Sequence, residues 1–140
     1  MYEVTFKNRP FRFVAGPKGA TCAFVVIDDL YAAFRSAMPR LGEDACRRLV
    51  LDGIRDNAAP HDKARVIIGD EILPTVSVDF VTTMMQGINS LIRKDKAFRK
   101  ATRGFDQVEA LLAGNMGPAA RALGYPSLYE LLGLEPVMFT

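Results

Sequence analysis

The chain has 140 residues, of which 49% are hydrophobic and 24% charged, and it carries two cysteines and a net charge of +2. A chain of this length buries roughly 68–70% of the surface that its unfolded form exposes, so we expect one domain over residues 1–140 that folds without disulfides or a structural metal. No run of about 18 apolar residues occurs and the first residues lack the pattern of a signal peptide, which excludes a membrane partner and favours a cytoplasmic protein.

The N-terminal residues predict three strands. Apolar and polar side chains alternate over residues 2–7 and again over residues 11–15, on either side of the turn-like Asn8-Arg9-Pro10, and this pattern indicates a β-hairpin. A second turn at residues 16–19 precedes the apolar run CAFVVI at residues 22–27, which is typical of a buried central strand.

Two helices are predicted next. In the first, Asp28 is placed to cap the N-terminus and Asp29 adds a favourable charge at the positive end of the helix dipole, while Pro39 ends the helix. The second helix spans about residues 42–56, with Cys46 on its apolar face, and a loop over residues 57–62 follows.

Two further strands are predicted at residues 64–68 and 71–76. They flank Gly69-Asp70, a pair that favours a tight hairpin turn with positive φ. Because Pro74 cannot donate a hydrogen bond to a neighbouring strand, we expect it at a sheet edge or a bulge.

The C-terminal third is expected to be helical. Ser77 is placed to cap a helix over residues 78–92, and a long amphipathic helix over residues 96–113 follows, ended by Gly114-Asn115. Two short helices are expected near residues 118–123 and 127–133. The apolar stripe of the long helix is spaced by three and four positions and consists of Phe98, Ala101, Phe105, Val108 and Leu112.

Strands in hairpin pairs with helices between them imply an α+β fold. We expect a small, mostly antiparallel sheet that is built from hairpins and packed against several helices, with a helical C-terminal third. Residues 2–76 would form the strand-rich part with two helices, and residues 78–133 the helical part.

Residues with catalytic or metal-binding chemistry are few and scattered. His61 is the only histidine and lies in a polar loop, and the separated Cys22 and Cys46 lie in apolar stretches as buried cysteines do. Asp28 and Asp29 are adjacent, so a helix cap explains them better than an acid–base pair. We therefore expect no catalytic residue, no metal and no cofactor, and hence no enzyme, although a metal site made only of carboxylates stays open.

The positive charge is concentrated in one short segment. Residues 1–92 hold 11 Lys and Arg and 11 Asp and Glu, which cancel, whereas residues 93–103 hold six bases and one acid. Residues 104–140 hold one base and four acids. The six bases are the candidate nucleic-acid-binding residues, and they are Arg93, Lys94, Lys96, Arg99, Lys100 and Arg103.

On the predicted helix, the four bases from Lys96 onward share the face that lies opposite the apolar stripe. Such a ridge suits phosphate contacts, since each neutralised phosphate releases a counterion. Basic residues near a helix N-terminus oppose the dipole, which favours a functional reason for them. The alternatives are an acidic protein partner and a plain solvated helix face.

Residues 119–125 and 128–134 resemble a Fis-type helix-turn-helix, in which a helix of small residues and a Leu-Gly step precede a recognition helix. The second segment carries Glu130 and no Lys or Arg, which suits the DNA major groove poorly. The alternative is a pair of short helices that pack through their leucines.

Several predicted elements follow one another in a characteristic order. The first is a hairpin at Val4–Val14, and the second is the strand-to-helix step Phe24-Val25-Val26-Ile27-Asp28-Asp29-Leu30. A strand pair follows around Gly69-Asp70, with Ala64–Ile68 before it and Ile72 and Val76 after it, and then a helix begins at Val78. Phe98 with its basic neighbours follows. Over about residues 2–105 this order resembles the N-terminal domain of the BRO family, found in phage and viral antirepressors. The resemblance implies a DNA-binding or repressor-antagonising role.

Two hypotheses for function follow. The first is a phage or prophage DNA-binding regulator of antirepressor type, which contacts the backbone of duplex DNA through the basic segment. The second is a small phage-type inhibitor that blocks a host or defence protein by protein–protein contact, without nucleic acid. A homodimer held by the apolar stripe is compatible with either role.

Overall fold

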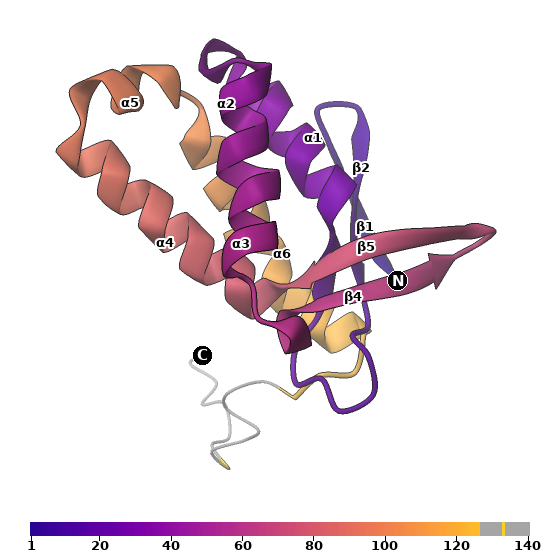
Figure 1. Ribbon diagram of the computed structural model, residues 1–140. Coiled ribbons are helices and arrows are strands. Elements are labelled where there is room, and N and C mark those ends of the chain that lie inside the picture. Colours follow the sequence, from indigo (N-terminus) through magenta and orange to yellow (C-terminus); the bar gives the residue numbers. More distant parts are fainter. Residues whose placement is uncertain (127–132, 134–140) are drawn as a thin grey trace, which may run out of the picture.

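A computed structural model describes residues 1–126 and Gly133 of the chain (Figure 1). Its centre is a five-stranded sheet in the order β1-β2-β3-β5-β4, and every neighbouring pair is antiparallel. The strands are β1 (Tyr2–Phe6), β2 (Arg9–Val14), β3 (Phe24–Val26), β4 (Lys63–Ile68) and β5 (Glu71–Ser77). The α+β fold with an antiparallel sheet built from hairpins is therefore confirmed.

The rest of the described chain is mostly helical. The α-helices are α1 (Ile27–Ala37), α2 (Glu43–Arg47), α3 (Gly53–Asn57), α4 (Val78–Lys94), α5 (Lys96–Ala101) and α6 (Phe105–Ala122). Short turns of other helical types are η1 (Pro39–Leu41), η2 (Arg48–Asp52) and η3 (Pro60–Asp62). Within the part of the chain that the structure describes, no helix combines the length and the apolar composition needed to cross a bilayer.

The structure has two tight hairpins. The β4–β5 hairpin turns at the predicted residues, whereas the β1–β2 hairpin does not. Lys7 and Asn8 both have positive φ, 48° and 67°, so the β1–β2 turn is Lys7-Asn8 and not Asn8-Arg9-Pro10. Two positive φ values in a two-residue loop match the right-handed twist of the flanking strands. In the β4–β5 hairpin Gly69 has the expected positive φ of 61°.

The central strand β3 is shorter than predicted and is fully buried over its three residues. It pairs with β2 only through Phe13 and Val14, and with β5 only through the stretch from Thr75 to Ser77. Pro10 and Pro74 both lie beyond these pairs, where their strands have a neighbour on one side only. Each proline is therefore accommodated at a locally open edge, as we expected for Pro74.

The chain passes from β3 directly into α1, and Val26 occupies the N-cap position without a side-chain hydrogen bond. The predicted Asp28 cap is therefore wrong, because the helix begins one residue before Asp28. Asp29 is 7% exposed and accepts hydrogen bonds from the backbone N–H of Arg12 (3.0 Å) and from its guanidinium (2.8 and 2.9 Å). This contact joins the first turn of α1 to β2 and raises the pKa of Arg12.

We expect Asp29→Asn to lower the free energy of unfolding by about 3 kcal/mol, because it leaves the guanidinium of Arg12 largely buried without its counter-charge. Urea denaturation followed by circular dichroism measures the change. Asp28→Asn is the matched control, since Asp28 is exposed in the same helical turn, and it should shift the free energy by less than about 0.5 kcal/mol. Equal losses in both variants would show that the Arg12 contact adds nothing specific.

The second predicted helix is one continuous helical stretch from Glu43 to Asn57, in which η2 is a π-helical turn between α2 and α3. Its buried residues Cys46, Val50 and Ile54 are four positions apart. On a regular α-helix of about 3.6 residues per turn such a spacing drifts around the axis, and the wider π turn compensates for the drift. The π turn thus keeps one apolar face toward the core.

The long helix predicted over residues 96–113 is wrong, because the chain breaks between α5 and α6. Gly104 has a φ of 105°, and a Cβ atom added to it would lie 2.0 Å from the backbone oxygen of Ala37, at the end of α1. Only glycine fits both the left-handed backbone and this close approach. The break is therefore imposed by packing against α1, which the local sequence pattern does not report.

Helix α6 also continues through the predicted stop at Gly114-Asn115 and includes Pro118. The side chain of Asn115 donates to the carbonyl of Leu111 (2.7 Å) and accepts from the hydroxyl of Tyr2 (3.2 Å), so it is held within the helix by β1. The predicted short helix near residues 118–123 is thus the end of α6. The predicted helix at residues 127–133, and with it most of the second half of the helix-turn-helix, lies outside the described residues.

The apolar stripe faces the core. Phe105, Val108 and Leu112 are at most 4% exposed, and the ring of Phe105 packs edge-on against Phe34 of α1 with 6.1 Å between centroids. These three residues are therefore covered by the chain itself and unavailable to a second copy, which leaves Phe98 and Ala101 as the half-buried part of the stripe.

We expect Gly104→Ala to destabilise the protein by more than about 2 kcal/mol, since the new methyl group meets the carbonyl of Ala37 at a strained φ. Gly114→Ala is the control, because Gly114 lies within α6 with open space around its Cβ position. That variant should be more stable than the wild type by about 0.5–1 kcal/mol. Thermal and urea unfolding measure both, and a tolerated Gly104→Ala would contradict the close approach.

Candidate nucleic-acid interface

The predicted basic residues gather where α4 turns into α5. Arg93 and Lys94 form the last turn of α4. Asp95 then leaves the helix and caps α5, because its carboxylate accepts a hydrogen bond from the N–H of Phe98 (3.0 Å). Phe98 packs against the core from the inner side of α5, so the lysines of α5 point outward.

Two of the six predicted residues take positions that the sequence did not suggest. Arg103 lies in the turn between α5 and α6, so it does not continue a helical face with Lys96. The guanidinium of Arg99 donates to the backbone carbonyls of Ile92 (2.9 Å) and Arg93 (3.1 Å) and so closes the C-terminus of α4. Arg99 therefore positions the two helices and is less available to a ligand than its neighbours.

The expected dipole penalty holds for Lys96, the first residue of α5, but not for three other bases. Arg93 and Lys94 lie in the last turn of α4, and Lys100 lies in the last turn of the short helix α5. Cations at a helix C-terminus are stabilised by the dipole, by about 0.3–1 kcal/mol each. The position of these three residues is thus electrostatically favourable, and a dipole penalty is no argument for a functional role of theirs.

Arg40 joins this region from a distant part of the sequence. It is exposed in η1, and it lines a surface recess of about 400 Å³ together with Pro39, Arg103, Gly104 and Asp106. Sequence reasoning missed Arg40 because only the break at Gly104 brings η1 next to the end of α5. We define the basic corner as Arg40, Arg93, Lys94, Lys96, Lys100 and Arg103.

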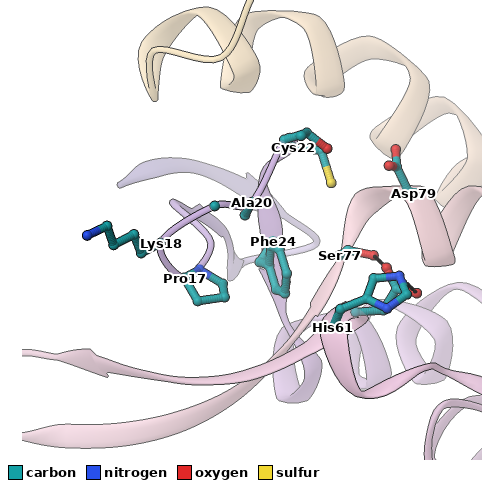
Figure 2. A pocket seen from close by; sticks show the side chains of 11 residues that line it. Pro17, Lys18, Ala20, Cys22, Phe24, His61, Ser77 and Asp79 are labelled. Carbon is teal, nitrogen blue, oxygen red and sulfur yellow. Dashed lines mark hydrogen bonds and ion pairs between the residues drawn. The ribbon is translucent and has the colours of Figure 1, made fainter.

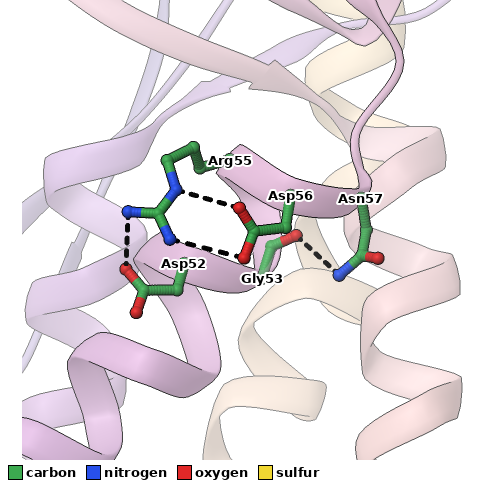
Figure 3. Close-up of polar contacts among 5 residues, drawn as sticks. All are labelled: Asp52, Gly53, Arg55, Asp56 and Asn57. Atoms are coloured by element: carbon green, nitrogen blue, oxygen red, sulfur yellow. Dashed lines mark hydrogen bonds and ion pairs between the residues drawn. The ribbon is translucent and has the colours of Figure 1, made fainter.

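All six residues of the basic corner are exposed, and none takes part in an ion pair with any residue of the described part of the chain. Figure 3 shows the contrast on α3, where Arg55 is exposed but engages Asp56 (2.9 Å) and Asp52 (3.3 Å). The same guanidinium lowers the pKa of the Asp56 carboxyl through its hydrogen bond. The charge of Arg55 is thus neutralised locally, whereas the charges of the basic corner are not.

A second hollow, of about 340 Å³, lies between the loop before β3 and the start of α4 (Figure 2). The hydroxyl of Ser77 donates to Asp62 (2.6 Å) and accepts from the N–H of Phe80 (3.1 Å), so it serves as the helix cap that the sequence predicted. His61 is 83% exposed, as expected for a loop histidine, and its Nε2 lies 3.4 Å from Asp62. The hydroxyl that could act as a nucleophile is therefore engaged by a carboxylate and a backbone amide.

The thiol in this hollow, Cys22, is half-buried, and desolvation raises its pKa. A protonated thiol is a poor nucleophile. Within residues 1–126 and Gly133, no group of three or more His, Cys, Asp or Glu side chains is placed to hold a metal ion. The hollow thus places a hydroxyl and a thiol beside carboxylates, Ser77 with Asp62 and Cys22 with Asp79, while the Asp79 carboxylate helps to keep the thiol protonated.

Comparison with known proteins assigns the chain to no family. No family model matches the chain, and no similar curated protein or solved structure was found. The resemblance to the BRO family stays a prediction from the sequence.

We expect the two thiols to differ in reactivity toward a disulfide reagent at pH 8. Burial raises the pKa of Cys46 to about 11, and this residue is 1% exposed, so it should react only as fast as the protein opens. Cys22 should react measurably, but more slowly than free cysteine. Absorbance kinetics on Cys22→Ser and Cys46→Ser separate the two, and both thiols should react alike in denaturant. A fast Cys46 in the folded protein would contradict its burial.

Proposed function

We propose that the protein is a non-catalytic, DNA-binding regulator of antirepressor type that contacts the phosphate backbone of duplex DNA through the basic corner. The observation that carries the proposal is the set of six exposed cations, drawn from η1, α4, α5 and the α5–α6 turn, without ion-pair partners among the described residues. Each phosphate that such a cation neutralises releases a counterion, which supplies affinity.

The chemistry of the basic corner favours phosphate contact over base reading. Its members are Lys and Arg side chains on the ends of two helices and on turns, and α5 has only six residues. Contacts of this kind position a protein on DNA and contribute affinity without carrying sequence information directly. We therefore expect binding that depends strongly on salt and weakly on sequence.

The test is fluorescence anisotropy with a labelled duplex over a series of salt concentrations. Replacing Lys94, Lys96 and Lys100 together by Ala should weaken binding uniformly across sequences and reduce the slope of log K against log salt by about 2.7, since each contact contributes about 0.9. Arg99 is kept, because its removal would disturb the junction of α4 and α5.

The matched control replaces Arg9, Lys18 and Arg121 by Ala. These residues are exposed and lie outside the basic corner, so the control loses the same net charge. It should keep most of the affinity and of the salt slope. If both triple variants bind DNA as the wild type does, the basic corner is not the DNA-binding surface.

The second candidate function is inhibition of a host or defence protein, because unpaired cations also attract an acidic protein surface. Pull-down from a host lysate with and without nuclease separates the two. A partner that survives nuclease treatment and is lost in the Lys94, Lys96 and Lys100 variant favours the inhibitor. A partner that is lost on nuclease treatment favours the DNA-binding regulator.

A further inference from the structure

The β4–β5 hairpin carries the most exposed apolar side chains of its sheet. Ile67 and Ile72 are 73% and 65% exposed, although both are large aliphatic residues on strands. They are cross-strand partners in the register of the hairpin, so they project from the same face. In Figure 1 the hairpin projects away from the helices, which leaves this face uncovered by the described residues.

This projecting part is supported on one side only. The pairing between β5 and β3 ends at Thr75, so the residues from Glu71 to Pro74 have β4 as their single neighbouring strand. A two-stranded hairpin without further cover is marginally stable in water. We call the residues Lys63–Pro74 the arm.

The outer side of β4 is an open edge. β4 is the last strand of the sheet, so a row of its backbone N–H and C=O groups has no partner strand among residues 1–126 and Gly133. Its six residues pair with β5 in an unbroken register that contains no bulge, and β4 itself contains no proline. Bulges, prolines and charged side chains are common devices that keep edge strands from pairing. This edge has no bulge and no proline, and its charged residues, Lys63 and Arg65, lie in the half of β4 away from the turn.

The charges of the arm are arranged with opposite signs at its two ends. Lys63 and Arg65 lie at the root of β4, whereas Asp70 and Glu71 lie at the tip. All four are exposed, and none forms an ion pair with another described residue. Two arms side by side in antiparallel orientation would therefore place the basic root of each beside the acidic tip of the other. A parallel arrangement would place like charges together.

We propose that β4 pairs antiparallel with β4 of a second copy of this chain, about a two-fold axis perpendicular to the sheet. The pairing joins the two sheets through backbone hydrogen bonds. Because such an axis keeps the same faces on one side, Ile67 and Ile72 of both copies form one apolar strip. The root-to-tip charges select this orientation over the parallel one.

The interface is small, which sets the strength of the association. Six residues per copy bury less than the roughly 1,200–2,000 Å² of a stable complex, so we expect a dissociation constant on the order of 10–100 µM. The dimer does not depend on DNA binding, because the arm and the basic corner lie on opposite sides of the molecule (Figure 1).

Analytical ultracentrifugation over a concentration series tests the proposal. The average mass of the wild type should rise from the 15.4 kDa of one chain toward twice that value. Ile67→Lys should weaken association at least about tenfold, since it places a charge in the apolar strip. Leu91→Lys is the matched control, because Leu91 is an exposed aliphatic residue of α4 outside the arm, and it should associate as the wild type does.

A charge exchange tests the orientation. One variant carries Lys63→Glu and Arg65→Glu, and the other carries Asp70→Lys and Glu71→Lys, so each has an arm of a single sign. Each should be monomeric alone, and an equimolar mixture should dimerise, which also shows that both variants fold. A monomeric wild type at every concentration would overturn the proposal. So would a mixture that fails to associate while the wild type dimerises, because the interface would then lie elsewhere.

Discussion

The ion pair between Arg12 and Asp29 sets the position of the helix around which the rest of the structure packs. A carboxylate that is 7% exposed needs charged and hydrogen-bonded partners, and Arg12 supplies both from its backbone and its side chain. Since β3 passes into α1 without a loop, this contact fixes how the helix leaves the sheet. Helix α1 then buries Leu30 and Phe34 against the strands and against α6.

The opposite end of α1 decides the shape of the helical part. The chain passes so close to the carbonyl of Ala37 that only a glycine fits, and Gly104 at that point divides what would otherwise be one helix. As a consequence, the basic residues do not form a straight ridge. They wrap around a corner formed by the end of α4, the short helix α5 and η1, where Arg40 and Arg103 share a recess.

The local excess of positive charge, six bases against one acid over residues 93–103, distinguishes this corner from other exposed parts of the protein. On the helical stretch from Glu43 to Asn57, Arg47 and Arg55 are exposed but paired with neighbouring acids. At the basic corner the nearest acid in sequence, Asp95, is engaged as a helix cap. The arm at the other side of the molecule carries separated charges of both signs. The two surfaces therefore suit different partners, an anionic polymer at the corner and a copy of the chain at the arm.

The sequence by itself determined the strands and their hairpin pairing, the apolar faces of most helices, the Ser77 cap, and the location of the positive charge. These features depend on local periodicity and on residues next to one another, as with Ser77 at the start of α4 or Gly69 between β4 and β5. The periodicity was sufficient to predict an antiparallel α+β fold, because hairpins and helices can be recognised from short stretches of sequence.

Only the tertiary structure decided the strand order, the break at Gly104, the burial of the apolar stripe, and the roles of Asp29 and Arg99. Each of these depends on a contact with a chain segment that the local pattern does not include, such as Arg12 for Asp29 or the carbonyl of Ala37 for Gly104. Local propensities are worth less than about 1 kcal/mol per residue, so such contacts override them. The charge of the candidate site could therefore be read from the sequence, whereas its shape and its sixth member, Arg40, could not.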